Sequence, residues 1–129
     1  MTERIFQTVF GLCLLVMFGM TVFGWKPPAS ILSEAGARWA EVNLRPDMMI
    51  ALALIYGIGA VTFLSDRFVA LGAAVQAPLA LNIAMYHVFV NKMLVPGGLI
   101  GAVYGICVAA MLWLNRDSYA PMFRAKPRA

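Results

Sequence analysis

The fold is decided first by residues 5–25, which read IFQTVFGLCLLVMFGMTVFGW and contain no charged side chain. A helix of this length spans about 30 Å, the thickness of the hydrocarbon core of a bilayer. Pro27 and Pro28 follow, and proline cannot continue a helix because it lacks a backbone N–H. The sequence around Trp25 and Lys26 is not a small-residue cleavage site, so residues 5–25 are predicted to form a retained transmembrane helix rather than a signal peptide.

Three further apolar runs follow, at about residues 47–64, 68–90 and 99–114. Hydrophobic residues make up 62% of the 129-residue chain and charged residues 12%, whereas about 25% of residues are charged in a typical soluble domain. Because a soluble protein of this length could not bury so much apolar surface, lipid is the expected solvent. The predicted fold is all-α: a single membrane domain over residues 1–129, with four transmembrane helices in a bundle.

A longer polar connection, residues 29–46, separates the first two runs. Ser30 is a candidate N-cap for a short helix within it. Apolar side chains recur through the connection at helical spacing, namely Leu32, Ala35, Trp39 and Val42. This pattern favours a short amphipathic helix that lies on the membrane or over the mouth of the bundle; an irregular loop is the alternative.

The basic residues predict the orientation of the chain. Four crossings place both termini on one side, together with Arg4, Arg67, Arg116, Arg124, Lys126 and Arg128, and leave on the other side Lys26, Arg38, Arg45 and Lys92. Because basic residues are retained in the cytoplasm, the chain is expected in a bacterial-type cytoplasmic (inner) membrane with both termini cytoplasmic. The net charge of +4 is explained in this way, and no run of basic and aromatic residues indicates nucleic-acid binding.

The fourth run carries a packing pattern. Small residues recur in it every four positions, at Gly97, Gly101, Gly105 and Ala109. A helix face of small residues allows another helix backbone to approach closely. Gly101 and Gly105 are therefore predicted to contact another helix, either in the same chain or in another one.

The third run holds the polar residues of the membrane interior. Gln76 and His87 are eleven residues apart, close to three helical turns, and share a face, whereas Asn82 and Tyr86 share another face. Pro78 predicts a kink, because it removes a backbone hydrogen bond. Because polar groups are costly in hydrocarbon, Asn82 and His87 are expected to line the bundle interior. Two roles are open: hydrogen bonding between helices, or ligand binding, for which the candidates are Gln76, Asn82, Tyr86 and His87.

Little else in the sequence points to chemistry. Cys13 and Cys107 form no CxxC, and a single histidine argues against a zinc site. Both cysteines lie within apolar runs and are expected to be reduced and dispensable. His87, whose imidazole titrates near neutral pH in water, is the first candidate for proton or redox chemistry. No catalytic set and no cofactor can be assigned.

Several segments of the second half, between Phe63 and Phe123, resemble one known family. They are Asp66-Arg67-Phe68, Gln76-Ala77-Pro78, Asn82-Ile83-Ala84-Met85-Tyr86-His87-Val88-Phe89, Pro96-Gly97-Gly98-Leu99 and Asn115-Arg116-Asp117-Ser118-Tyr119-Ala120-Pro121-Met122-Phe123. These segments resemble the DoxX-like family of small membrane proteins. Members of that family carry Gly-x-x-Lys at the end of the first helix, whereas Gly19-Met20-Thr21-Val22 lacks the lysine here.

The resemblance implies a four-helix membrane bundle related to subunits linked to quinol oxidation, thiol systems or oxidative stress. The leading hypothesis is a redox- or quinone-associated subunit or a small hydrophobic-ligand binder, which a closed pocket near Asn82 and His87 would favour. The alternative is a non-catalytic accessory subunit that packs against a larger membrane complex, which a small-residue stripe facing lipid would favour. A small transporter is disfavoured, because no run has a central charged residue. The expected partners are the lipid bilayer and either other membrane subunits or further copies of the chain.

Overall fold

The computed structural model describes residues 2–92 and 98–123, and it is helical almost throughout this part of the chain. No strand occurs in these two ranges, so the all-α prediction is confirmed. In chain order the elements are α1 (Thr2–Val22), η1 (Ala29–Ile31), α2 (Glu34–Asn43), α3 (Pro46–Ser65), α4 (Val69–Met85), the π-helix η2 (Tyr86–Asn91), α5 (Leu99–Leu114), α6 (Arg116–Tyr119) and η4 (Ala120–Phe123).

Three helical segments are long and apolar enough to cross a membrane: Thr2–Val22, Pro46–Ser65 and Val69–Asn91. The helix α5 is apolar but shorter, with 16 residues. Large apolar side chains are exposed on all four of these segments, among them Val16, Leu54, Leu81 and Ile106. A surface of this kind is costly in water and ordinary in lipid, so the chain is a membrane protein.

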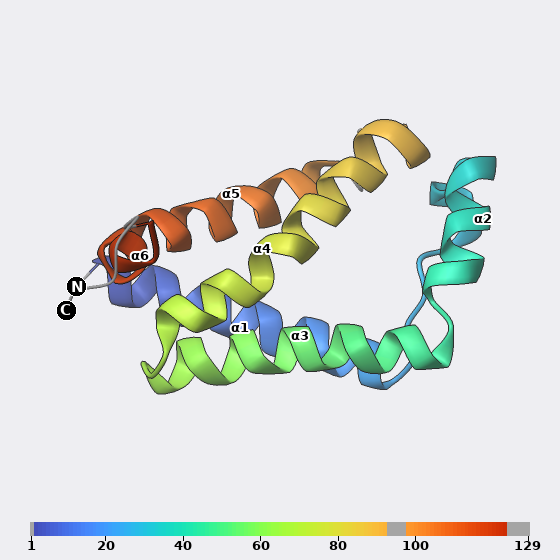
Figure 1. Ribbon diagram of the computed structural model, residues 1–129. Coiled ribbons are helices and arrows are strands. Elements are labelled where there is room, and N and C mark those ends of the chain that lie inside the picture. Colours follow the sequence, from blue (N-terminus) through green and yellow to red (C-terminus); the bar gives the residue numbers. More distant parts are fainter. Residues whose placement is uncertain (1, 93–97, 124–129) are drawn as a thin grey trace.

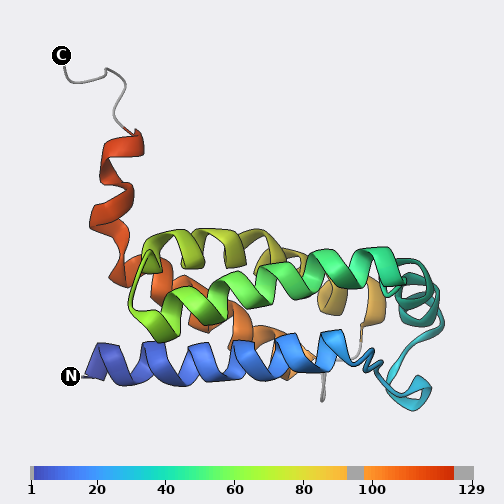
Figure 2. The ribbon, with the colours of Figure 1, turned by 90° about the horizontal axis from the view of Figure 1, so that it is seen from below.

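The long helices run back and forth between two ends of the molecule. Figure 1 shows α1 and α3 side by side as one antiparallel pair, with α4 and α5 forming a second pair above them. The two pairs meet through α3 and α4, and α2 stands across one end (Figure 1). At the other end, α6 and η4 leave the bundle at a steep angle to the long helices (Figure 2).

The first long helix ends earlier than predicted, at Val22 rather than Trp25. Gly24 adopts a positive φ of 70°, which glycine accepts at little cost. Its N–H bonds the carbonyl of Thr21 at 3.1 Å, and the N–H of Trp25 bonds that of Met20 at 2.9 Å. This pair of bonds is a Schellman motif, so a glycine ends α1 before the prolines are reached.

At the opposite end of the molecule, α1 caps α3. The last carbonyls of a helix lack partners within that helix, and here Gln7 Nε2 donates to the carbonyl of Phe63 at 2.8 Å. Gln7 also donates to Asp66 Oδ1 at 2.9 Å, and Arg4 pairs with the same carboxylate at 2.7 Å. These contacts fix the start of α1 beside the turn between α3 and α4.

The core lies where α1, α3, α4 and α5 come closest together. Its largest fully buried apolar side chains are Leu14, Phe63 and Met111. Phe10 stacks on Phe63 with 5.5 Å between ring centroids and tilts against Tyr104 at 5.9 Å. Aromatic contacts therefore join three helices at the level of the buried polar group described below.

The connection between α1 and α3 contains the predicted short helix, α2, but its details differ from the prediction. Its N-cap is Ser33, whose Oγ accepts the N–H of Gly36 at 3.0 Å; Ser30 belongs to the preceding turn η1. Gly36 is the buried residue of α2, whereas Val42 is 62% exposed. The buried face of α2 is therefore the face that contacts η2, which includes Gly36 and Trp39 but leaves Val42 exposed.

Candidate functional site

Gln76 is the central polar group of the bundle, with a fully buried side chain. Its Nε2 donates to the backbone carbonyl of Ile55 in α3 at 2.6 Å. Its Oε1 accepts the hydroxyl of Tyr104 in α5 at 2.5 Å. One amide thus joins α3, α4 and α5, and it uses both its donor and its acceptor to do so.

The packing around Gln76 leaves no spare room. A Cβ on Gly59 would lie 2.3 Å from Gln76 Nε2 and 2.6 Å from a methyl carbon of Leu14. Tyr56 also packs edge-on against Tyr104, with 6.4 Å between their ring centroids. Gln76 was a candidate ligand contact, and the structure shows that its amide is already used in joining helices.

Asn82 does not line the interior, contrary to the prediction, because its side chain is exposed. The reason is helical geometry. Successive residues of an α-helix are rotated by about 100°, so Asn82 lies about 120° from Gln76 around α4. A helix that turns Gln76 and His87 toward the core must therefore turn Asn82 away from it.

His87 lies on the inner side of η2, against α5. A Cβ on Gly101 would lie 2.8 Å from His87 Cδ2 and 3.1 Å from a methyl carbon of Ile83, so the glycine makes room for the imidazole. The Nδ1 of His87 is buried and has no hydrogen-bond partner within residues 2–92 and 98–123. The position of the imidazole is therefore set by packing against Gly101 and Ile83, and not by a hydrogen bond at Nδ1.

Tyr86 faces α2. It faces neither Gln76 nor α5, the helix that His87 contacts. Its ring packs on that of Trp39 with 4.3 Å between centroids. The phenol oxygen lies 3.0 Å from the position of a Cβ on Gly36. Of the four ligand-binding candidates, only Tyr86 and His87 lie in contact, with 4.9 Å between their ring centroids. Gln76 is buried between α3, α4 and α5, and Asn82 is exposed, so the four do not surround one space.

Asn91 is the polar residue that sequence reasoning missed. It is 2% exposed at the end of η2, and its Oδ1 accepts the backbone N–H of Ser33 at 2.8 Å. Its Nδ2 reaches the carbonyl of Ile31 at 3.5 Å. In the sequence, an asparagine beside a lysine and a glycine-rich segment indicates an exposed turn. Asn91 is buried only because η1 and α2 pack against the end of η2, where its side chain bonds their backbone.

The small-residue pattern on α5 divides between two sides of the helix. Gly101 is buried against α4 and η2, whereas Gly105 has no neighbouring atom within 4 Å of an added Cβ and Ala109 is exposed. Gly97 lies outside the described residues. A four-residue repeat drifts by about 40° at each step around a helix with 3.6 residues per turn, so the pattern leaves the core after Gly101.

Two cavities among the described residues lie between the end of α1 and the start of α3, and neither is lined by Asn82 or His87. The first is a groove of about 470 Å³, lined by Phe18, Thr21, Val22, Gly24, Lys26, Leu44, Pro46, Met49, Ile50, Ala53 and Leu54. The second has a volume of about 100 Å³, and its lining includes Tyr56 and the three methionines Met17, Met20 and Met49. Neither is lined by a residue of α4 or η2.

The remaining candidates for chemistry are dispersed. Cys13 is exposed on α1 and Cys107 is half-buried on α5, and both are free thiols. Within the described ranges, no three His, Cys, Asp or Glu side chains are grouped as a metal site would require. At the far end, the hydroxyl of Tyr119 donates to the carbonyl of Ala70. Burial raises the pKa of Tyr119, and since tyrosine is protonated at neutral pH even without such a shift, this hydroxyl is a donor.

Comparison with known proteins adds no relative, since no family model, curated protein or solved structure matches the chain. What the site can do therefore rests on its geometry alone. That geometry offers a bonded junction at Gln76, an unfilled small-residue face on α5, and two apolar cavities beside α1 and α3.

Proposed function

We propose that this chain is an accessory subunit in the membrane, one that crosses the bilayer four times and packs against a larger membrane protein through α5. The observation that carries the proposal is the open space beside Gly105. Glycine in the middle of a helix costs roughly 1 kcal/mol relative to alanine, and within residues 2–92 and 98–123 no atom lies within 4 Å of the position of a Cβ on Gly105.

The rest of this face supports the same proposal. Ala102 and Ala109 are exposed one turn to either side of Gly105, so three small residues form a shallow strip. Ile106 and Trp113, which are each 68% exposed, flank the strip with large apolar side chains. Small residues with larger neighbours allow close helix–helix packing in lipid, where contact area rather than exclusion of water drives association.

Gly105→Leu tests the proposal. The leucine fills the open space without touching the core of this chain, so the variant is expected to keep its thermal stability in detergent and to lose its partner. Membranes expressing wild type and the variant would be solubilised gently, and the complexes compared by native electrophoresis and by mass spectrometry of co-purifying proteins.

Two glycines of the same chain give matched controls. A Cβ on Gly19 in α1 would likewise have no neighbour within 4 Å among the described residues, so Gly19→Leu is expected to leave the complex intact. Gly101 touches His87 and Ile83, so Gly101→Leu is expected to lower stability itself. Equal partner retention by Gly105→Leu and wild type would contradict the proposal. A complex made only of this chain would assign the same face to self-association.

A second candidate function is the binding of a small hydrophobic ligand such as a quinone, as in a DoxX-like redox-associated subunit. The observation that favours it is the smaller cavity of about 100 Å³, which is lined by Tyr56 and three methionines and shares Thr21, Leu44 and Met49 with the larger groove of about 470 Å³. Because small-molecule sites occupy about 300–1,000 Å³, a quinone would have to extend from the smaller cavity into this groove. Methionine side chains adapt to ligands of varied shape. Leu52→Trp, which fills this cavity, is expected to remove a bound quinone or similar ligand from the extracted protein, as measured by mass spectrometry of its organic extract.

A further inference from the structure

The larger groove lies between the end of α1 and the start of α3. Its walls run from Phe18 to Lys26 on one side and from Leu44 to Leu54 on the other. Its volume of about 470 Å³ is within the range of about 300–1,000 Å³ that small-molecule sites occupy. Apart from Thr21 and Lys26, its lining is apolar or backbone.

The groove runs along the helices, and its length is close to the thickness of one leaflet of the hydrocarbon core. The helical turns from Pro46 to Leu54 extend for about 12 Å at 1.5 Å per residue, and one leaflet of the hydrocarbon core is about 15 Å thick. Val22, Ile50 and Leu54 on its walls are each more than half exposed, so the groove opens sideways toward lipid. An occupant would therefore lie parallel to the helices within a single leaflet.

The mouth of the groove carries one basic side chain that belongs to no ion pair among the described residues, and a second basic side chain, beside the lining, that is paired. The first is Lys26, which lines the groove and is exposed. Arg45 is the N-cap residue of α3, next to the lining residues Leu44 and Pro46, and its partner Asp47 is at 3.6 Å. Trp25 precedes Lys26, and tryptophan and lysine both favour the level of the lipid headgroups.

We propose that this groove binds one anionic phospholipid, whose acyl chain lies between α1 and α3 and whose phosphate is held by Lys26. The apolar walls bind the chain and the cation selects the headgroup, because basic residues near the membrane surface attract anionic lipids. A zwitterionic lipid with the same tails fits the walls and gains less from the lysine.

The test uses the full chain in nanodiscs that contain equal amounts of phosphatidylglycerol and phosphatidylcholine with identical tails. Native mass spectrometry after release would count the retained lipids. Wild type is expected to retain one phosphatidylglycerol in preference to phosphatidylcholine, and Lys26→Gln to reduce this preference about fivefold. Ala53→Phe, which fills the groove, is expected to remove retention of both lipids.

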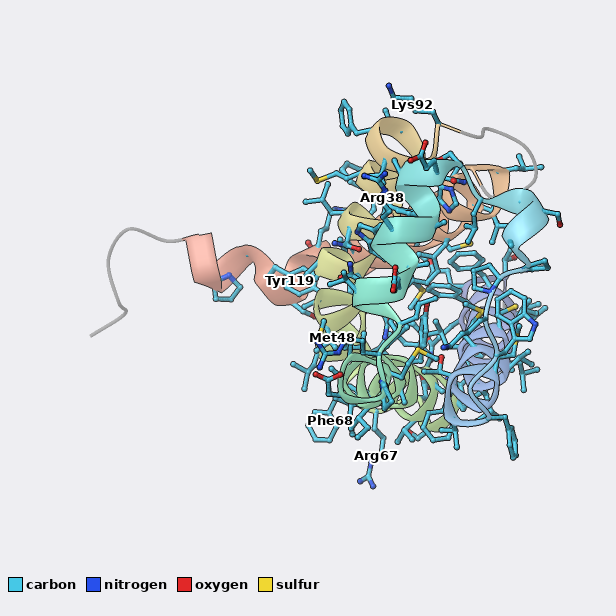
Figure 3. The ribbon with its side chains drawn as sticks, turned by 90° about the vertical axis from the view of Figure 1, so that its right-hand side faces the viewer. Arg38, Met48, Arg67, Phe68, Lys92 and Tyr119 are labelled. Carbon is cyan, nitrogen blue, oxygen red and sulfur yellow. The ribbon has the colours of Figure 1, made fainter. Side chains whose placement is uncertain are left out.

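Lys92→Gln is the matched control. Lys92 is exposed at the same end of the molecule, at the opposite edge from α1 and α3 (Figure 3), and it does not line the groove. The Lys92→Gln variant is expected to keep the wild-type preference for phosphatidylglycerol over phosphatidylcholine. Equal losses in Lys26→Gln and Lys92→Gln would show diffuse attraction and overturn the proposal, as would a wild type without preference. If Ala53→Phe fails to fold, Ile50→Trp on the exposed wall replaces it, and undiminished retention there also overturns the site.

Discussion

At the scale of single residues, the two side-chain amides of α4 show that burial depends on the direction in which a side chain leaves the helix. Gln76 and Asn82 have similar chemistry and both lie in an apolar run, yet one is fully buried with two partners and the other is exposed. The difference comes from their angle around the helix. Their contributions to stability should differ in the same way.

Gln76→Ala is expected to lower the unfolding free energy in detergent by about 2 kcal/mol, because it breaks two interhelical hydrogen bonds and leaves a void. Tyr104→Phe, which removes one of these bonds, should cost about 1 kcal/mol or less. Asn82→Ala is the control and should change stability little. Thermal or denaturant unfolding of the three variants is the measurement, and equal effects of Gln76→Ala and Asn82→Ala would contradict the junction.

At the scale of elements, the short helix α2 is held by polar contacts at its start rather than by an apolar face. The N–H of Ser33 and the buried amide of Asn91 form the closest of these contacts, at 2.8 Å. The Trp39 and Tyr86 rings add packing nearly two turns further along. Removing the Asn91 side chain should therefore weaken the attachment of α2 to η2 and leave the packing of the long helices unchanged.

Asn91→Ala is expected to increase hydrogen exchange and protease cleavage within residues 29–43, because the backbone of Ser33 and Ile31 loses its buried partner. Exchange within α1 and α3 should stay at the wild-type level. Arg38→Ala, which breaks an exposed ion pair with Glu34 on the same helix, serves as the control, because exposed pairs of this type contribute little. If hydrogen exchange and protease cleavage within α2 of Asn91→Ala matched those of wild type, the role of Asn91 in holding α2 would be refuted.

At the scale of the whole molecule, the alternating direction of the long helices sets which charges share an end. Arg4 is bonded to Asp66, so the start of α1 and the turn after α3 lie together, and α2 stands at the other end (Figure 1). Four crossings with the termini in the cytoplasm, the orientation that the bias of basic residues predicts, would place Arg67 and Arg116 inside.

Cysteine labelling tests this orientation. In a background with Cys13 and Cys107 replaced by alanine, Ser118→Cys is expected to be protected from an impermeant thiol reagent in intact cells, and Glu34→Cys to be labelled. Both should react after the cells are opened. The background itself should be stable and assembled, because both thiols are free and were predicted to be dispensable. Labelling of Ser118→Cys from outside would reverse the topology.

The sequence by itself determined the all-α class and the positions of the apolar helices, because length, charge content and proline positions act locally. For the connection between the first two helices it left a short helix and an irregular loop as alternatives. It also determined that Gln76 must have partners, since an amide in hydrocarbon needs them. Only the tertiary structure decided which partners those are, that Asn82 faces outward, and that Asn91 is buried. Those outcomes depend on how each helix is rotated against neighbours distant in sequence, and packing of whole faces fixes that rotation.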